Sequence, residues 1–542
     1  MEILQSFLRL APYLTLPNIT LAAVTLAAVT LTLALILKSI LAAAFSPLRS
    51  IPGPFLARFT RLWLLRHFLR GDFHKTNIQL HQRYGPIVRI APHTYSLSDP
   101  AALRPVYGHG SRFTKAAFYD ASRNPDAPRA DLFCARDPAA HAALRRLVAR
   151  LYSASTVVRM EAGVHGCVGA LVARLGEFAR GEAVAGTRGV RGRGVEVDLQ
   201  FWLQCYAFDV VGAVTVDRRF GFLERGEDGL GLWEALHRSL AYLTYVGVVP
   251  EWHRWAYAVK KWTGNNGMAG LFGFAAGEVG KRLQETAMEA AGEEKGGKEV
   301  EESGEDFLAK MVRMHREDPE KFGFSEMMLV CAMNIGAGSD STSVALSAVM
   351  WFLMKHPEVL AKLRAELDTA AAEGLISATE FLSYQQAQKL PYLQAVISEG
   401  LRVHSPPGVP LSREAPKGGA EIAGTFFPEG SVLGMNAWVM HANKDVFGDD
   451  AEEYRPERWL VSKEEIGRMD RSILTAQWGL GSRTCIGKNI ALMEISILIP
   501  ELVRSFDFRL VRPDAELETQ NVFFVKQKNL WVNVSERKTE AP

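Results

Sequence analysis

Cysteine is scarce and scattered in this chain of 542 residues. The five cysteines are odd in number, no two form a Cys-x-x-Cys pair, and their spacing matches no zinc site. This pattern disfavours a disulfide framework and favours a reducing compartment. An excess of charge of one sign is also lacking. The formal net charge of +2 therefore indicates neither nucleic acid nor an acidic polymer as a partner.

A complete Gly-x-Gly-x-x-Gly loop after a strand is missing as well. Gly336-x-Gly338 falls inside an expected helix and has no third glycine, so no nucleotide-binding domain of this kind is predicted. Two stretches, 181–194 and 292–306, are rich in glycine and charged residues, and we expect them to be solvated connectors. With 48% hydrophobic residues, the remainder is typical of a folded protein with a large core.

One long uncharged run stands at the N-terminus, from Ile19 to Leu37. Its length suits a membrane-spanning helix, which needs roughly 20 residues. A cleaved signal peptide has a shorter apolar core, although the alanines at 42–44 keep that alternative open.

Basic residues are more frequent after this run than before it, which places the C-terminal body in the cytosol by the positive-inside tendency. We therefore expect residues 1–45 to form a membrane anchor with a transmembrane helix at about 19–37. Residues 46–542 are expected to form one cytosolic domain.

The most informative segment is 478–487, which reads Trp-Gly-Leu-Gly-Ser-Arg-Thr-Cys-Ile-Gly. Cys485 lies just before an apolar helical pattern that starts near Lys488, and a helix N-terminus favours the thiolate over the thiol. The glycines allow a flat group to approach the backbone, and Arg483 offers a planar cation for a carboxylate. A thiolate beside a planar carboxylate-bearing partner indicates haem. The alternative is a glycine-rich turn with a buried, inert cysteine.

A second segment, 325–355, predicts a buried helix of about 30 residues, roughly 45 Å long. Ser325 is the expected N-cap, and His356-Pro357 ends the helix. The polar, glycine-containing run 336–343 in its middle is costly inside an apolar helix. It indicates room for a ligand and a proton route. The alternative is a kinked core helix whose hydroxyls bond back to carbonyls one turn earlier.

A third pattern is Glu399-x-x-Arg402 on a helix that opens near Pro391, because residues three apart share a helix face. A solvated surface pair of this kind contributes little. Here the surroundings are apolar, and an arginine-rich segment with Arg458 follows.

These segments resemble the motifs of the cytochrome P-450 superfamily. The loop resembles Phe-x-x-Gly-x-Arg-x-Cys-x-Gly and departs from it only at Trp478. The helix segment 337–342 resembles the oxygen-binding pattern Ala/Gly-Gly-x-Asp/Glu-Thr-Thr/Ser, with Ser341 where the first threonine normally stands. The resemblance extends from the prolines after the anchor to the C-terminal strands.

The resemblance implies a mainly α fold with a smaller β region, preceded by one transmembrane helix. It implies haem b with Cys485 as the thiolate ligand, and Asp340, Ser341 and Thr342 as a proton relay. It further implies that four residues contact the haem propionates: His141, Arg145, Arg413 and Arg483.

Other residues receive supporting roles from the same resemblance. Glu399, Arg402 and Arg458 are expected to brace the cysteine loop from behind, and Trp478 to shield the sulfur. The expected substrate walls are Phe118, Tyr119, Val409 and Leu411.

The implied activity is insertion of one oxygen atom from O2 into a C–H bond of a lipophilic small molecule. Hydroxylation, epoxidation and O-demethylation all belong to this class. The segments 51–54 and 84–92 look most like those of fungal microsomal members of the pisatin-demethylase kind, many of which tailor secondary metabolites.

A membrane-bound, NADPH-dependent flavoprotein reductase is the implied partner, and the endoplasmic reticulum membrane the implied location. Two other functions remain open at this point: a haem-thiolate isomerase or dehydratase, and a membrane-tethered haem sensor that is not an enzyme. Both leave the Asp340–Ser341 pair without a role.

Overall fold

The structure is a computed structural model that describes residues 16–127, 129–182, 187–190, 194–264, 267–290, 306–472 and 477–538. The expected connector at 292–306 lies outside the described residues except for its last residue.

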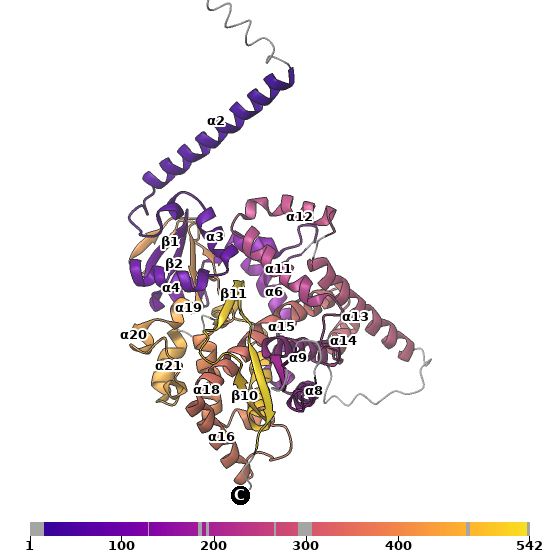
Figure 1. Ribbon diagram of the computed structural model, residues 1–542. Helices are drawn as coiled ribbons and strands as arrows, with labels where there is room; N and C mark the ends of the chain where they lie inside the picture. The colour runs from indigo at the N-terminus through magenta and orange to yellow at the C-terminus, as the bar shows by residue number, and fades with distance from the viewer. Residues whose placement is uncertain are drawn as a thin grey trace, which may run out of the picture.

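Helix α2 (Leu16–Ala44) projects away from the body as a single rod (Figure 1). Its most apolar part, Ala23–Ala44, has a mean hydropathy of 2.2 and is not buried at all. The helix extends beyond the predicted span at both ends. Past Leu37 it continues because alanines and a leucine prolong the apolar helical pattern. An apolar surface of this extent suits the interior of a lipid bilayer. The chain therefore carries a candidate N-terminal membrane anchor.

Most of the body is helical, and its helices are α3 (Leu62–Arg70), α4 (Phe73–Tyr84), α5 (Leu103–Tyr107), α6 (Pro138–Val148), α7 (Ala154–Val158), α8 (Glu161–Ala179), α9 (Leu199–Val216), α10 (Phe222–Arg225), α11 (Leu232–Val246), α12 (His253–Trp262), α13 (Gly267–Ala290), α14 (Phe307–Glu317), α15 (Phe324–Lys355), α16 (Pro357–Ala372), α17 (Tyr384–Ala387), α18 (Pro391–Val403), α19 (Ala437–His441), α20 (Lys444–Phe447), α21 (Lys463–Ser472) and α23 (Lys488–Ser505). Short 3-10 turns join several of them, at η2 (Phe55–Arg58), η3 (Pro100–Ala102), η4 (Ala117–Ser122), η5 (Ala149–Tyr152), η6 (Pro250–Trp252), η7 (Pro456–Trp459) and η8 (Gly481–Arg483).

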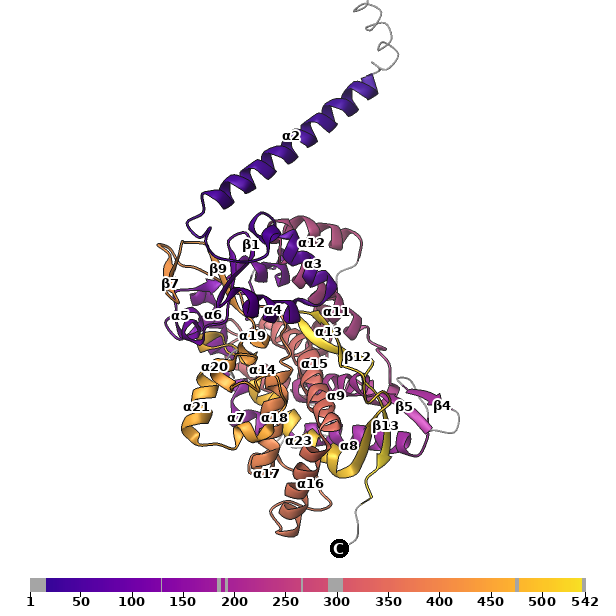
Figure 2. The same cartoon turned by 60° about the vertical axis from the view of Figure 1, so that its left-hand side comes forward.

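The long helix α15 crosses the middle of the body, where it packs against α9, α13, α18 and α23 (Figure 2). The main hydrophobic core forms around α8, α9, α15 and α23. Helix α9 is long and apolar enough to cross a membrane, but 89% of it is buried inside the protein, so it is a core helix.

The β region consists of small antiparallel and mixed sheets at the edges of the helical body. A five-stranded sheet has the order β1-β2-β9-β6-β3 and a four-stranded sheet the order β10-β13-β5-β4, beside the hairpins β11-β12 and β7-β8. The strands are β1 (Ile87–Ala91), β2 (Thr94–Leu97), β3 (Thr114–Lys115), β4 (Thr187–Val190), β5 (Gly194–Asp198), β6 (Arg413–Glu414), β7 (Ala420–Ile422), β8 (Thr425–Phe427), β9 (Val432–Met435), β10 (Phe506–Leu510), β11 (Glu518–Val522), β12 (Phe524–Lys528) and β13 (Trp531–Glu536). The predicted mainly α fold with a smaller β region is confirmed.

Two local predictions were wrong. The connector at 181–194 contains β4, which pairs with β5 in antiparallel register, because an edge strand needs backbone partners more than apolar side chains. Ser325 is not the N-cap of α15. The helix is capped at Gly323, whose N–H donates to the carboxylate of Glu326 at 3.0 Å.

Candidate functional site

Cys485 lies between η8 and α23, with its side chain exposed. Its N–H donates to the carbonyl of Trp478 at 2.6 Å and closes the loop. Gly479 and Gly481 adopt φ values of 74° and 68°, which a residue with a side chain rarely adopts. A Cβ at Gly481 would also stand 2.5 Å from the carbonyl oxygen of Tyr107. The loop therefore needs these glycines to hold the sulfur where it is.

Opposing effects act on the pKa of Cys485, whereas the sequence predicts only effects that favour the thiolate. Desolvation by the surrounding protein raises the pKa of Cys485, while the N–H groups of Gly487 and Lys488 and the charge of Arg145 lower it. The expected preference of the bare chain for the thiolate is thus outweighed by desolvation. A bound metal cation removes the proton from a coordinating thiol outright.

A cluster of five basic side chains lies near this loop, on α6 and on three loops or strands that meet there. Its members are Lys115, His141, Arg145, Arg413 and Arg483. Arg145 donates to the carbonyl of Thr484 at 2.7 Å, next to the sulfur-bearing residue. Arg483 donates to the carbonyls of Ala135 at 2.5 Å and Arg136 at 3.2 Å. Within the described residues, none of the five forms an ion pair with a carboxylate.

Mutual repulsion and burial act on this basic cluster. Burial and then the charge of Arg483 lower the pKa of His141 to about 3, with further contributions from the other cations of the cluster. Burial, Arg413 and Arg483 likewise hold the pKa of Lys115 well below its usual value. Burying like charges without an anion is costly, so the arrangement calls for an anionic ligand. The two carboxylates of a haem would meet this demand.

Lys115 was missed at the level of sequence. Its ammonium group donates to the carbonyl of Phe133 and lies 4.4 Å from the ring centre of Tyr119. A lone lysine in a two-residue strand has no motif around it. Only the apolar context of Phe113 and Ala116 could have indicated a buried cation.

The polar segment of α15 divides its side chains between two faces. Ser341 is half-buried next to the exposed Ala337, and its hydroxyl donates to the carbonyl of Ala337 at 2.7 Å. Asp340 is buried and turns towards α9 and β12. The hydroxyl of Thr342 is buried and has no hydrogen-bond partner within the described residues. The hydroxyls of Ser339 and Ser341 donate to carbonyls one turn earlier, as the alternative prediction for this segment holds. Helix α15 nevertheless remains one continuous helix.

Asp340 has two partners that the sequence did not indicate. The amide of Gln204 on α9 donates to its Oδ1, and the ammonium of Lys526 on β12 lies 3.7 Å from the same oxygen. Neither residue belongs to a recognisable motif.

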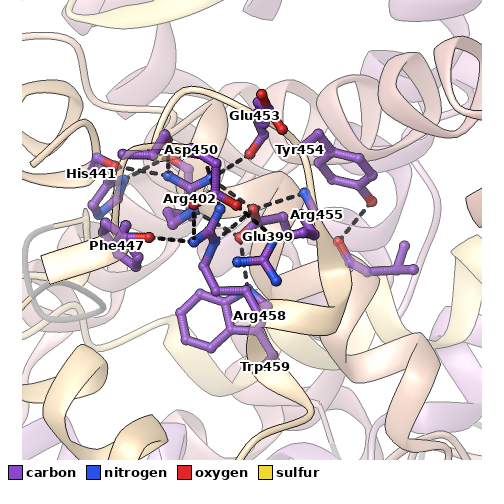
Figure 3. Close-up of polar contacts among 12 residues, drawn as sticks. Glu399, Arg402, His441, Phe447, Asp450, Glu453, Tyr454, Arg455, Arg458 and Trp459 are labelled. Carbon is purple, nitrogen blue, oxygen red and sulfur yellow. Dashed lines mark hydrogen bonds and ion pairs between the residues drawn. The ribbon is translucent and has the colours of Figure 1, made fainter. Parts of the chain in front are cut away.

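Glu399 and Arg402 form a buried pair that is satisfied on every side (Figure 3). Arg402 donates to both carboxylate oxygens of Glu399 at 2.7 Å. Arg458 adds a contact to Glu399 at 3.3 Å, and the indole of Trp459 donates to it at 2.8 Å. The remaining N–H groups of Arg402 donate to the carbonyls of His441, Ala451 and Glu453. Those of Arg458 donate to the carbonyls of Phe447 and Asp450. The structure therefore brings the three predicted residues together in one network.

The amide of Gln477 connects this network's helix to the cysteine loop. With the amide of Gln477 oriented so that both its atoms are satisfied, its nitrogen donates to the carbonyl of Leu401 at 2.8 Å. Its oxygen accepts the indole N–H of Trp478 at 3.1 Å. Gln477 thus ties α18 to the residue that closes the loop.

The four residues expected to form substrate walls are packed among other side chains or exposed in part. Phe118 and Tyr119 meet edge to face at 5.4 Å. Tyr119 and Val409 are fully buried in the packing, and the carbonyl of Leu411 accepts the hydroxyl of Tyr107. Their part in binding a substrate stays a prediction.

Comparison with known proteins identifies the family of this chain. The family model described as cytochrome P-450 matches residues 52–534. Pisatin demethylase of Fusarium vanettenii is 37% identical over 492 residues, which cover 91% of this chain and 91% of that protein. A cytochrome P-450 monooxygenase of Aspergillus terreus is 34% identical, over 86% of this chain and 92% of the relative. The monooxygenase pkfB of Emericella nidulans is 34% identical, over 93% and 95% respectively.

The match spans nearly the whole body, and the exposed thiol with its basic cluster suits the cofactor of that family. The chain therefore belongs to the cytochrome P-450 family and is a monooxygenase whose cofactor is haem b with a cysteine thiolate ligand.

Proposed function

We propose that Cys485 is the thiolate ligand of the haem iron, and that the haem lies between its loop and α15. The single observation that carries this proposal is the exposed sulfur beside five basic side chains without a carboxylate partner among the described residues. His141, Arg145, Arg413 and Arg483 bind the propionates in this proposal, and Lys115 joins them. Glu399, Arg402, Arg458 and Trp478 hold the loop rigid.

When bound, the haem supplies the chemistry that reduces O2 and oxidises a C–H bond of the substrate. The protein's own part is to supply protons and to keep the site dry. Ser341 lies on the open face of α15, where its hydroxyl would serve as the proton donor, and Asp340 would supply it from the buried side. Thr342 is the least suited of the three predicted relay residues, because its hydroxyl is enclosed without a partner among the described residues.

We further propose that residues 1–45 anchor the protein in the endoplasmic reticulum membrane by a single helix. Residues 46–542 then form one catalytic domain on the cytosolic side. An NADPH-dependent flavoprotein reductase in the same membrane delivers the electrons. The unburied apolar surface of Ala23–Ala44 and the basic residues that follow it support this arrangement.

The proposed reaction is hydroxylation or O-demethylation of a lipophilic secondary metabolite of a fungus. Support comes from the pisatin demethylases of Fusarium vanettenii, which are similar over 91% of this chain. In O-demethylation, oxygen inserted into the methyl C–H bond gives a hemiacetal that releases formaldehyde and leaves a hydroxyl group.

Deletion of the gene in its host tests this proposal directly. Comparing metabolite masses with the parent strain should reveal a precursor that lacks one oxygen or carries one extra methyl group. Microsomes that contain the chain and the reductase should convert that precursor only with NADPH. Product formed without reductase would instead favour an isomerase, and no turnover would favour a haem sensor.

A further inference from the structure

Asp340 borders a polar cleft between α11, α15 and the β11-β12 hairpin. The cleft has a volume of about 330 Å³, and its lining includes Gln200, His237, Lys526 and Lys528. One water molecule occupies about 30 Å³ in the liquid, so the cleft has room for several waters. Its polar lining provides the hydrogen bonds that such waters need.

Lys526 stands between solvent and the carboxylate in this cleft. Its side chain is 23% exposed, whereas that of Asp340 is 6% exposed. The ammonium lies 3.7 Å from Asp340 Oδ1, donates to Gln204 Oε1 at 2.5 Å and lies 5.0 Å from the ring centre of Trp233. Gln204 completes the triangle, since its amide N–H donates to the same Asp340 oxygen.

Two contacts on one oxygen fix the direction in which the carboxylate points. A buried carboxylate without a cation tends to take up a proton or to turn towards other donors. The pair of Lys526 and Gln204 keeps the carboxylate at the edge of the polar cleft, one residue away from Ser341 along α15. No residue of the cysteine loop or the basic cluster takes part in this arrangement.

We propose that Lys526 and Gln204 are positioning residues that hold Asp340 at the inner end of this cleft, through which the protons for oxygen reduction enter from solvent. This inference rests on the proposed monooxygenase function and deepens it. Each turnover consumes one O2, two electrons from NADPH and two protons, one of them from NADPH by way of solvent and one from the medium. One oxygen atom enters the substrate and the other leaves as water.

The experiment uses the full-length chain with its reductase and p-nitroanisole as the probe, because loss of its methyl group releases a coloured phenol. The reaction with O2 is ArOCH3 + O2 + NADPH + H⁺ → ArOH + HCHO + H2O + NADP⁺. The quantity measured is phenol formed per NADPH oxidised. Lys526→Met should lower this ratio at least threefold and raise hydrogen peroxide release, because oxygen reduced without timely protons leaves as peroxide.

Two variants make the comparison specific. Lys526→Arg keeps the positive charge and should restore at least half of the parent ratio. Lys528→Met changes a lysine that lines the same cleft but whose ammonium has no hydrogen bond or ion pair among the described residues, and it should lower the ratio less than Lys526→Met does.

Hydrogen peroxide supplied directly gives ArOCH3 + H2O2 → ArOH + HCHO + H2O, which brings its own protons and consumes none from solvent. Lys526→Met should therefore keep its peroxide-driven activity within twofold of the parent. Failure of the parent chain to demethylate the probe by either route would argue against O-demethylation and not against the role of the cleft. Amide hydrogen exchange then tests whether Lys526 holds Asp340.

Exchange at residues 518–528 should become faster in Lys526→Met and stay at the parent rate in Lys526→Arg, because the ion pair ties the hairpin to α15. Two results would overturn the proposal. One is an unchanged exchange rate in Lys526→Met, and the other is faster exchange together with an unchanged ratio of phenol to NADPH, since that combination marks a purely structural ion pair.

Discussion

Arg402 donates to both carboxylate oxygens of Glu399 at 2.7 Å, and the two side chains are 1% and 0% exposed. A buried pair of this kind is held by its complete set of partners, because either charge left alone in the core is costly. The network therefore makes the fold behind the cysteine loop intolerant of change.

Replacing Glu399 by Gln should lower the free energy of unfolding by about 3–5 kcal/mol, since it leaves the buried guanidinium of Arg402 without an anion, whereas Arg458 keeps its ion pair with Asp450. The measurement is urea denaturation together with the yield of haem-bound protein. Arg537→Gln removes the partner of the more exposed Asp368 and serves as the control, with an expected change of at most about 1 kcal/mol. Equal effects of the two variants would contradict the role given to the network.

Arg145→Met should weaken haem retention about tenfold, because it removes the cation proposed to hold a propionate, and a charge-assisted hydrogen bond contributes about 1.5–3 kcal/mol. The measurement is the rate of haem transfer to apomyoglobin, compared with the haem content after purification. Arg146→Met is the matched control, since Arg146 is the exposed next residue on α6. Lys115→Met should resemble Arg145→Met. If it retains haem like the parent, Lys115 does not belong to the propionate site.

Ser341→Ala should reduce product per NADPH several-fold and increase hydrogen peroxide release, because the open face of α15 then lacks its hydroxyl. Ser341→Thr restores a hydroxyl with a more restricted rotamer and should match or exceed the parent. Ser347→Ala, which removes a buried hydroxyl further along the same helix, is the control. Peroxide release from Ser341→Ala at the parent level would argue against a relay through this residue.

Buried histidines make stability fall in acid. Burial lowers the pKa of His81 and of His404 to about 4 in the folded chain, from an ordinary value of 6.5. Between pH 6.5 and 4 the unfolded chain binds more protons, so the stabilisation present above pH 6.5 is lost as pH falls towards 4. Each histidine contributes a slope of about 1.4 kcal/mol per pH unit in that window.

Urea denaturation from pH 7.5 to 4 measures this slope, and His81→Gln should reduce it by about 1.4 kcal/mol per pH unit. A slope that His81→Gln leaves unchanged would mean that His81 is already charged in the folded protein.

The full chain and a chain without its N-terminal helix should differ in how they are extracted from membranes. The full chain should stay in the membrane pellet after alkaline carbonate, because Ala23–Ala44 has an apolar surface long enough for a bilayer. A chain without residues 1–45 should be released under the same conditions. Retention of the truncated chain would place the main membrane contact elsewhere in the body.

Much of the architecture could be predicted because the informative patterns are local. The glycine spacing around Cys485, the long apolar run of α15 and the Glu399–Arg402 spacing all express backbone requirements within one loop or one helix. The partners of Asp340 could not be predicted in this way. Lys526 lies 186 residues further along the chain and Gln204 lies 136 residues before it, so only tertiary packing brings them together. Lys115 was missed for the same reason.

The most direct test of the account is the absorption spectrum of the reduced protein with carbon monoxide. The parent chain should show the long-wavelength band that a thiolate ligand produces, and Cys167→Ala, which changes a buried cysteine on α8, should keep it. Cys485→Ala should lose the band while its far-ultraviolet circular dichroism stays helical. A band that persists in Cys485→Ala, or that is missing from the parent, would contradict the assignment of Cys485 as the haem ligand.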